Sequence, residues 1–331
     1  MFKKLLFILI VFLTVNLSLS AQKVVEDKYA VKELALPKEA KEAKEAKEGW
    51  TKIGGLGADF SWLNLINPRS GSGDNRVGFG GLLNYSANLV KDKLIWNNRL
   101  GLQLALVQVG NTALTKANDV LQFTSQAGYK IGSGKWYAAG LFDVQTQFLP
   151  TYGKNYLSEN PKGVTQTLEL TGGLFSPATV RFAPGVIYKA NPNLTILYSP
   201  VALKAVIVSN AKLAKTGNFF PLDATKPDKK VDFQVGSELR IDYINKFFDG
   251  KVAYTGTLDL YSNYLRDPQN IDLEFYNSLD FFIVKNFSIN FKSDWFYDHD
   301  IFVFGSGDVE KPTHRNIFIR NALLLKYSQS F

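Results

Sequence analysis

The chain has 331 residues, no cysteine, two histidines and a formal net charge of +8. Without cysteine it can form neither a disulfide nor a thiolate metal site. Its basic residues are scattered rather than gathered on one element, which is not typical of a nucleic-acid-binding protein. The mean hydropathy is −0.07, and beyond the amino terminus no stretch offers the ~18 uncharged apolar residues that a membrane-spanning helix needs.

The amino terminus has the three parts of a secretion signal. Lys3 and Lys4 precede an apolar run over residues 5–13, and a small-residue boundary follows at Ala21. The run is too short for an anchor helix that spans a bilayer. We therefore expect residues 1–21 to be a signal peptide that is cleaved after Ala21.

Residues 22–49 differ in composition from the rest of the chain. From Lys38 to Glu48, Lys and Glu each recur at every third position. Opposite charges then meet at i,i+4 only in the weaker order, with Lys before Glu, and a short isolated helix is marginal in water. The pattern predicts a solvated, charged periplasmic linker, and a docking segment for a periplasmic partner is the alternative.

From residue 50 to 331, apolar residues alternate with small, polar or charged ones in about twelve segments. In one of them, Val231, Phe233 and Val235 alternate with Asp232 and Gln234. A soluble sandwich also alternates, but it does not normally place ionised residues opposite so many long apolar faces. The pattern predicts an all-β fold, a transmembrane antiparallel β-barrel of about 12 strands in the bacterial outer membrane. The expected strands are 50–65, 76–90, 94–109, 119–130, 135–149, 174–190, 193–209, 231–245, 251–265, 270–284, 286–298 and 315–331.

The connections between these strands alternate between long and short. In outer-membrane barrels the long loops lie outside the cell and the tight turns in the periplasm. An even number of strands then places both termini on the periplasmic side. Aromatic residues gather at both ends of the outward faces, with Trp96 and Trp136 at one rim and Phe79 and Trp295 at the other. Such rings are typical of the two interfaces of a bilayer.

The last strand ends in an outward series that closes with Tyr327 and Phe331. This series resembles the carboxy-terminal signal that the barrel-assembly machinery recognises, although Gln329 departs from it. We therefore expect the assembly machinery as a partner, together with outer-membrane lipid and lipopolysaccharide. The basic charge could favour either anionic lipopolysaccharide or an anionic solute. We expect no nucleic-acid partner and no cofactor.

Several short phrases go beyond general barrel texture. The phrases are Leu174-Phe175-Ser176-Pro177, Gly185-Val186-Ile187-Tyr188-Lys189, Tyr198-Ser199-Pro200, Leu260-Tyr261-Ser262-Asn263-Tyr264, Asn270-Ile271-Asp272-Leu273 and Tyr297-Asp298-His299-Asp300-Ile301. Their order and spacing resemble a Bacteroidota outer-membrane family catalogued as a domain of unknown function. The resemblance runs from about residue 50 to the end and implies fold and location, but no activity and no catalytic residue.

The inward phase of the predicted strands collects charges of both signs, which could fill the lumen as an ion-pair network or line a path for solutes. The candidate lumen residues are Arg99, Asp143, Arg181, Glu238, Arg240, Asp242, Asp259, Asp280, Lys292, Asp294 and Arg320. Asp298, His299 and Asp300, with His314 across the same loop, could instead hold a divalent cation. A solvated loop at the end of a strand is the simpler interpretation of that cluster.

Three functions remain compatible with the sequence. The first is a narrow, porin-like channel or transporter for small polar solutes, which the polar inward phase favours. The second is a structural or assembly component of an envelope complex, which the linker and the long loops permit. The third is a lipid-modifying enzyme, which would depend on His299 alone. No catalytic motif is present: there is no G-x-S-x-G elbow, phosphate loop or dinucleotide fingerprint.

Overall fold

The structure is a computed structural model of the chain. It describes residues 48–63, 76–153, 155–216, 219–220, 225–226, 228–284, 286–299 and 316–330. The expected signal peptide and almost all of the expected linker lie outside these ranges. Among the described residues, no helix has both the length and the apolar character needed to cross a membrane.

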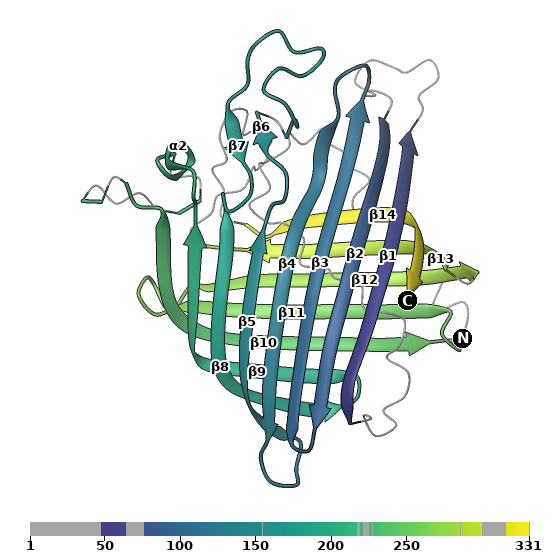
Figure 1. The fold of residues 1–331 in the computed structure, drawn as a ribbon, viewed down its shortest axis with the longest axis vertical. Helices are drawn as coiled ribbons and strands as arrows, with labels where there is room; N and C mark the ends of the chain where they lie inside the picture. The colour runs from purple at the N-terminus through teal and green to yellow at the C-terminus, as the bar shows by residue number, and fades with distance from the viewer. Residues whose placement is uncertain are drawn as a thin grey trace.

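Twelve antiparallel strands close into a barrel, as the alternation predicts (Figure 1). Around the barrel the order is β1-β14-β13-β12-β11-β10-β9-β8-β5-β4-β3-β2, and the first and last strands meet where Gly55 pairs with Ser330. The strands are β1 (Gly49–Leu63), β2 (Arg76–Lys91), β3 (Leu94–Val109), β4 (Thr115–Lys130), β5 (Trp136–Thr146), β8 (Ala178–Asn191), β9 (Leu194–Ile207), β10 (Val231–Phe247), β11 (Val252–Asn263), β12 (Ile271–Val284), β13 (Phe287–Tyr297) and β14 (Phe318–Ser330).

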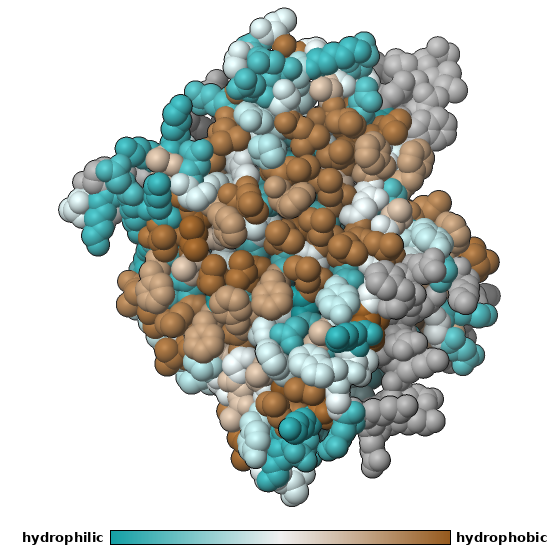
Figure 2. Space-filling view, in the orientation of Figure 1, coloured by the Kyte–Doolittle hydropathy of each residue, from teal (hydrophilic) through white to brown (hydrophobic). Residues whose placement is uncertain are grey.

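The two faces of the barrel wall follow the period of two. On β2 the outward residues Phe79 and Tyr85 are exposed, whereas Asn84 and Ser86, the two residues that flank Tyr85, are buried. The same alternation around the barrel produces a broad apolar band across the middle of the outer face, with polar surface above and below it (Figure 2). Because successive strand side chains point to opposite faces, the buried polar residues line the inside.

Most strand bounds agree with the prediction to within two residues, and the differences lie at the end with the long connections. β4 begins at Thr115 rather than at 119, so the β3–β4 connection is only five residues long, from 110 to 114. β5 ends at Thr146, and β8 begins at Ala178 rather than at 174. The connection between them contains a small sheet that the period of two did not predict, β6 (Thr151–Tyr152) with β7 (Leu170–Gly172).

Long connections also pack on one another. A one-turn helix, α2 (Ala211–Ala214), buries Leu213 and Ala214 in a cluster with Val208 and Phe220. The hydroxyl groups of Ser176 and Ser209 lie 2.9 Å apart and join the β5–β8 and β9–β10 connections. We call this end of the barrel the long-loop end, and the end that carries the turns at 92–93, 131–135, 192–193 and 248–251 the short-turn end.

The wall is irregular where β8 meets β9, near Pro184 and Pro200, because proline cannot donate a hydrogen bond to a neighbouring strand. Pairing between the two strands is interrupted between Phe182 and Val186. A Cβ atom on Gly185 would lie 2.1 Å from the carbonyl oxygen of Tyr198, so only glycine fits this close approach of two backbones.

Candidate solute path through the barrel

The inside of the barrel is polar and crowded. Five carboxylate side chains from four strands are almost completely shielded from solvent: Asp143, Asp232, Glu238, Asp259 and Asp294 are each at most 2% exposed. A carboxylate in such a place needs a cation or hydrogen-bond donors to remain charged. The contacts below show that this barrel supplies both.

Arg181 on β8 reaches across the barrel. Its guanidinium lies 3.9 Å from Glu238 on β10 and 3.5 Å from Glu274 on β12. In the order of the strands, β12 is four places away from β8, so the second ion pair is a chord through the lumen rather than a contact between neighbours. The hydroxyl of Tyr276 donates to the same Glu274 carboxylate at 3.0 Å.

Arg240 on β10 is the second arginine of the lumen that binds several carboxylates. Its Nε and Nη2 atoms bind the Asp242 carboxylate at 3.0–3.2 Å, and its Nη1 lies 3.7 Å from Asp259 on β11. Thr257 donates to Asp242 at 2.8 Å. Arg99 on β3 interacts electrostatically with both Asp242 and Arg240, so this centre also involves the opposite part of the wall.

Asp143 on β5 connects the side chains around Arg181 with those around Arg240. Gln122 and Thr124 of β4 donate to its Oδ1 at 2.8 and 2.6 Å, and both Arg181 and Arg240 interact with it electrostatically. The structure thus brings together the candidates Arg99, Asp143, Arg181, Glu238, Arg240, Asp242 and Asp259, with Glu274 as an eighth member. We call these eight residues the central network.

The central network holds more negative than positive charge. It contains five carboxylates and three guanidinium groups, which gives a formal charge of −2, whereas the whole chain carries +8. The positive charge of the protein is therefore located outside this part of the lumen.

The remaining candidates lie in a second group along β12, β13 and β14. Lys326 lies 3.4 Å from Asp280, which also accepts a hydrogen bond from Ser288 at 2.9 Å. Lys292 is half-buried, and Asp294 is buried opposite the backbone of Arg320, whose side chain lies outside the described part of the chain.

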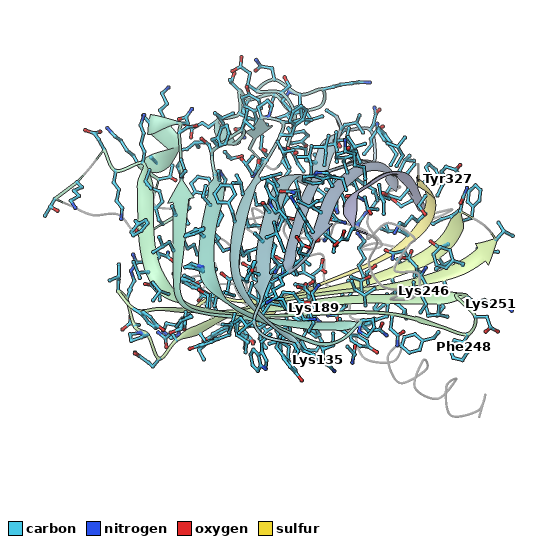
Figure 3. The ribbon with its side chains drawn as sticks, turned by 60° about the horizontal axis from the view of Figure 1, so that its bottom comes forward. Lys135, Lys189, Lys246, Phe248, Lys251 and Tyr327 are labelled. Carbon is cyan, nitrogen blue, oxygen red and sulfur yellow. The ribbon has the colours of Figure 1, made fainter. Side chains whose placement is uncertain are left out.

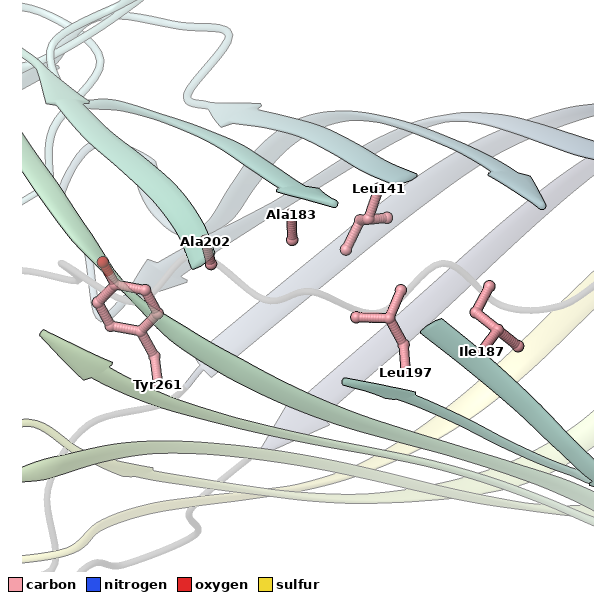
Figure 4. Packing of buried hydrophobic residues seen from close by; sticks show 6 residues of the cluster. All are labelled: Leu141, Ala183, Ile187, Leu197, Ala202 and Tyr261. Atoms are coloured by element: carbon pink, nitrogen blue, oxygen red, sulfur yellow. The ribbon is translucent and has the colours of Figure 1, made fainter. Parts of the chain in front are cut away.

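Not all of the inner face is polar. Leu141, Ile187 and Leu197 are completely buried and form a cluster with Ala183, Ala202 and Tyr261 (Figure 4). The ammonium of Lys204 lies 4.9 Å from the centre of the Tyr261 ring and forms a cation–π contact. We did not expect these inward apolar and aromatic side chains, although their positions on the inward phase of their strands could have revealed them.

The possible metal cluster is only partly described. His299 Nδ1 lies 3.3 Å from the hydroxyl of Tyr297, while Asp300 and His314 lie outside the described residues. Within the ranges that the structure describes, no group of three or more His, Asp or Glu side chains could hold a metal ion. Of the expected assembly signal, Tyr327 packs against Phe287 with a ring separation of 4.9 Å, and Phe331 lies outside the description.

Comparisons with known proteins give one family match and a set of distant structural neighbours. Residues 63–152 match a family model described as a protein of unknown function (DUF3078). No curated protein sequence matches the chain. Among solved structures, the COG4313 outer membrane channel from Pseudomonas putida F1 is 12% identical, with a TM-score of 0.40 over 93% of this chain and 100% of that one. The translocator domain of the autotransporter NalP from Neisseria meningitidis is 11% identical, with a TM-score of 0.35 over 86% and 90% of the two chains.

Proposed function

We propose that this chain is an outer-membrane channel with a narrow lumen for small polar solutes, and that the lumen favours cations. A closed strand array with an apolar outer band and a polar interior suits a lipid bilayer, since each strand pairs with a neighbour on both sides and no edge is open. The observation that carries the proposal is the central network, which crosses the lumen and has a formal charge of −2.

The network supports a narrow path rather than a wide pore. The Arg181–Glu274 ion pair joins strands that are four places apart, and fixed charges at a constriction of the lumen select the ions that enter it. Five carboxylates against three guanidinium groups favour entry of a cation. The excess is small, so we expect modest selectivity that a single substitution alters.

In this proposal the short turns and both termini face the periplasm, and the long loops face outward, where the outer leaflet holds lipopolysaccharide. The protein reaches the membrane after cleavage of its signal peptide, and the barrel-assembly machinery inserts it. The order of the phrases described above further suggests a Bacteroidota source.

The test is the reversal potential of purified protein in a planar bilayer under a salt gradient. We expect a preference for cations that Asp242→Asn reduces, because this substitution lowers the negative charge of the central network from −2 to −1. The matched control is Asp228→Asn, which removes one carboxylate from the exposed long-loop end. The hydrogen bond from Lys215 lowers the pKa of Asp228, so this carboxyl group is ionised at neutral pH. An anion preference in the unmodified protein, or equal effects of the two variants, would contradict the proposal.

A structural role in an envelope complex is the second candidate. The packed cluster that α2 forms with Leu170 of β7 at the long-loop end favours it, because this cluster offers a partner protein an ordered surface. Folded protein that never conducts, in any salt, would favour this role over the channel.

A further inference from the structure

Polar side chains lie next to one another on the outer face of β12, β13 and β14. In the register of these strands Asn277 pairs with Ser293, and Ser293 pairs with Asn321. They belong to the outward phase, since the neighbours of Asn321 in that phase, Ile319 and Leu323, are 47% and 69% exposed. We call Asn277, Ser293 and Asn321 the polar row.

In a membrane-embedded barrel the polar row lies at the depth of the hydrocarbon core. Tyr327 lies near the end of β14 (Figure 3) and packs on Phe287 with ring centres 4.9 Å apart, and such outward aromatic residues mark an interface of the bilayer. Asn321 is six residues from Tyr327, and Ser293 is six residues from Phe287. At ~3.4 Å per residue and a strand tilt of ~45°, the row lies about 14 Å from that interface, near the middle of an apolar band ~25 Å tall.

Two members of the polar row have hydrogen-bond partners within the barrel itself. Asn277 accepts a hydrogen bond from the Tyr254 hydroxyl at 2.6 Å and donates one to the Ser293 carbonyl at 3.0 Å. The indole N–H of Trp295 donates to the Ser293 hydroxyl at 2.8 Å. Asn277 and Ser293 therefore do not require a partner from outside the chain.

Asn321 differs from them, because its side chain is exposed and the structure gives its amide no hydrogen-bond partner within the described ranges. The outward Asn98 on β3 shows the contrast, since it accepts a hydrogen bond from Ser125 at 2.8 Å and donates one to the Ala87 carbonyl at 3.2 Å. Hydrocarbon offers no hydrogen bond, so an unsatisfied amide at this depth is costly. Asn321 therefore requires a polar partner that reaches the middle of the bilayer.

A second copy of the chain fits this requirement. Lipid headgroups and water-soluble proteins lie outside the hydrocarbon core, so the partner is itself a membrane-spanning protein. A carboxamide both donates and accepts hydrogen bonds, so two Asn321 side chains that face each other across a two-fold axis satisfy one another. This part of β14 is also accessible from the side, because its pairing with β1 covers Leu325–Ser330 and ends before Asn321.

We propose that two copies of this chain associate in the membrane through the outer face of β13 and β14, with Asn321 hydrogen-bonded to the partner subunit's Asn321. Such a two-fold contact uses the same patch on both copies, and hydrogen bonds between polar side chains stabilise contacts between membrane-spanning segments. The inference rests on the proposed membrane location but not on conduction. Single copies that conduct would refute this inference alone, and paired copies that never conduct would refute only the proposed channel.

The first test counts the copies in each complex in a lipid bilayer. The chain has no cysteine, so Lys212→Cys at the exposed long-loop end carries a single fluorophore, and the purified full chain is diluted into phosphatidylcholine bilayers. We expect two photobleaching steps in each fluorescent spot. Asn321→Leu in the same background should weaken the dimer about tenfold, so that single steps dominate at the same dilution. The matched control is Asn98→Leu, which removes an outward asparagine from β3 and should leave two steps.

The second test locates the contact by disulfide trapping. A disulfide requires two Cα atoms ~4.4–6.8 Å apart, so only a residue near the two-fold axis links to its own counterpart. Under mild oxidation in bilayers Asn321→Cys should form a disulfide-linked dimer, because the covalent bond traps even a weakened contact. Phe142→Cys, on the exposed face of β5, should remain monomeric. Faster migration of unboiled protein on a gel verifies that each variant is folded.

Four results would overturn the inference. These are single photobleaching steps in the Lys212→Cys protein, equal effects of Asn321→Leu and Asn98→Leu, no disulfide-linked dimer of Asn321→Cys, and, in cell membranes, a disulfide between Asn321→Cys and a different protein. The second and third would place the contact on another face of the barrel, and the fourth would make the different protein the partner.

Discussion

Replacing Arg181 with Gln should weaken the barrel and open its lumen at the same time. Arg181 contacts carboxylates at 3.5 and 3.9 Å, and at an effective dielectric constant of ~20 each such pair corresponds to an attraction of about 4 to 5 kcal/mol before desolvation is counted. Removal of one partner of a buried ion pair leaves the other charge uncompensated, which costs about 3–5 kcal/mol. The Glu238 side chain is 0% exposed and that of Glu274 is 27% exposed, so we expect a cost within that range.

The assay is a double-mutant cycle with Glu274→Gln, read both as the free energy of unfolding in urea and as single-channel conductance. The double variant restores the formal charge of the central network to −2, so it should recover part of the stability lost by Arg181→Gln, with a coupling energy of about 1–3 kcal/mol. Conductance should rise both in Arg181→Gln and in the double variant, because the Arg181–Glu274 ion pair no longer crosses the lumen. If Arg181→Gln destabilises the protein but leaves its conductance unchanged, the network fills the barrel without controlling a path.

Three further predictions concern folding and insertion. Gly185→Ala should destabilise the barrel by about 1–3 kcal/mol in urea unfolding, since its Cβ would overlap the adjacent strand, whereas Gly81→Ala, with its nearest atom at 3.9 Å, should be neutral; equal effects would refute this reading of the β8–β9 contact. Deletion of Phe331 should reduce the amount of folded protein in outer-membrane fractions, and unchanged amounts would show that the terminal residue is dispensable. Leu239→Glu, on the outer face, should impair insertion at a depth-dependent cost of ~2 kcal/mol or less, whereas Gln126→Glu on the inner face should insert normally; the reverse result would mean that the two faces are assigned the wrong way round.

The period of two predicted the fold because it reports directly which face of a strand is buried. It gave twelve strands and their inward residues, including the fully buried Asp143. It failed at β6, β7 and α2, because elements of two to four residues are too short to show a period. It also missed the inward Leu141 and Ile187, where an apolar residue is buried inside the barrel rather than facing outward.

The central network could be predicted only in part. Sequence alternation assigns Arg181 and Glu274 to the inward face, but it does not say which inward residues meet. Their contact depends on the closure of the barrel and on the tilt of its strands, which bring β8 opposite β12. The negative charge of the central network could not be predicted either, because the sequence shows only the net charge of the whole chain, which is +8.

Single-channel recording of the unmodified protein tests the central claim most directly. Protein that migrates faster before boiling than after it, which verifies a folded barrel, is inserted into a planar bilayer under a gradient of potassium chloride. We predict small, discrete conductance steps with a reversal potential that shows a preference for cations. Folded protein that gives no conductance, or large steps with a reversal potential on the anion side, would contradict it.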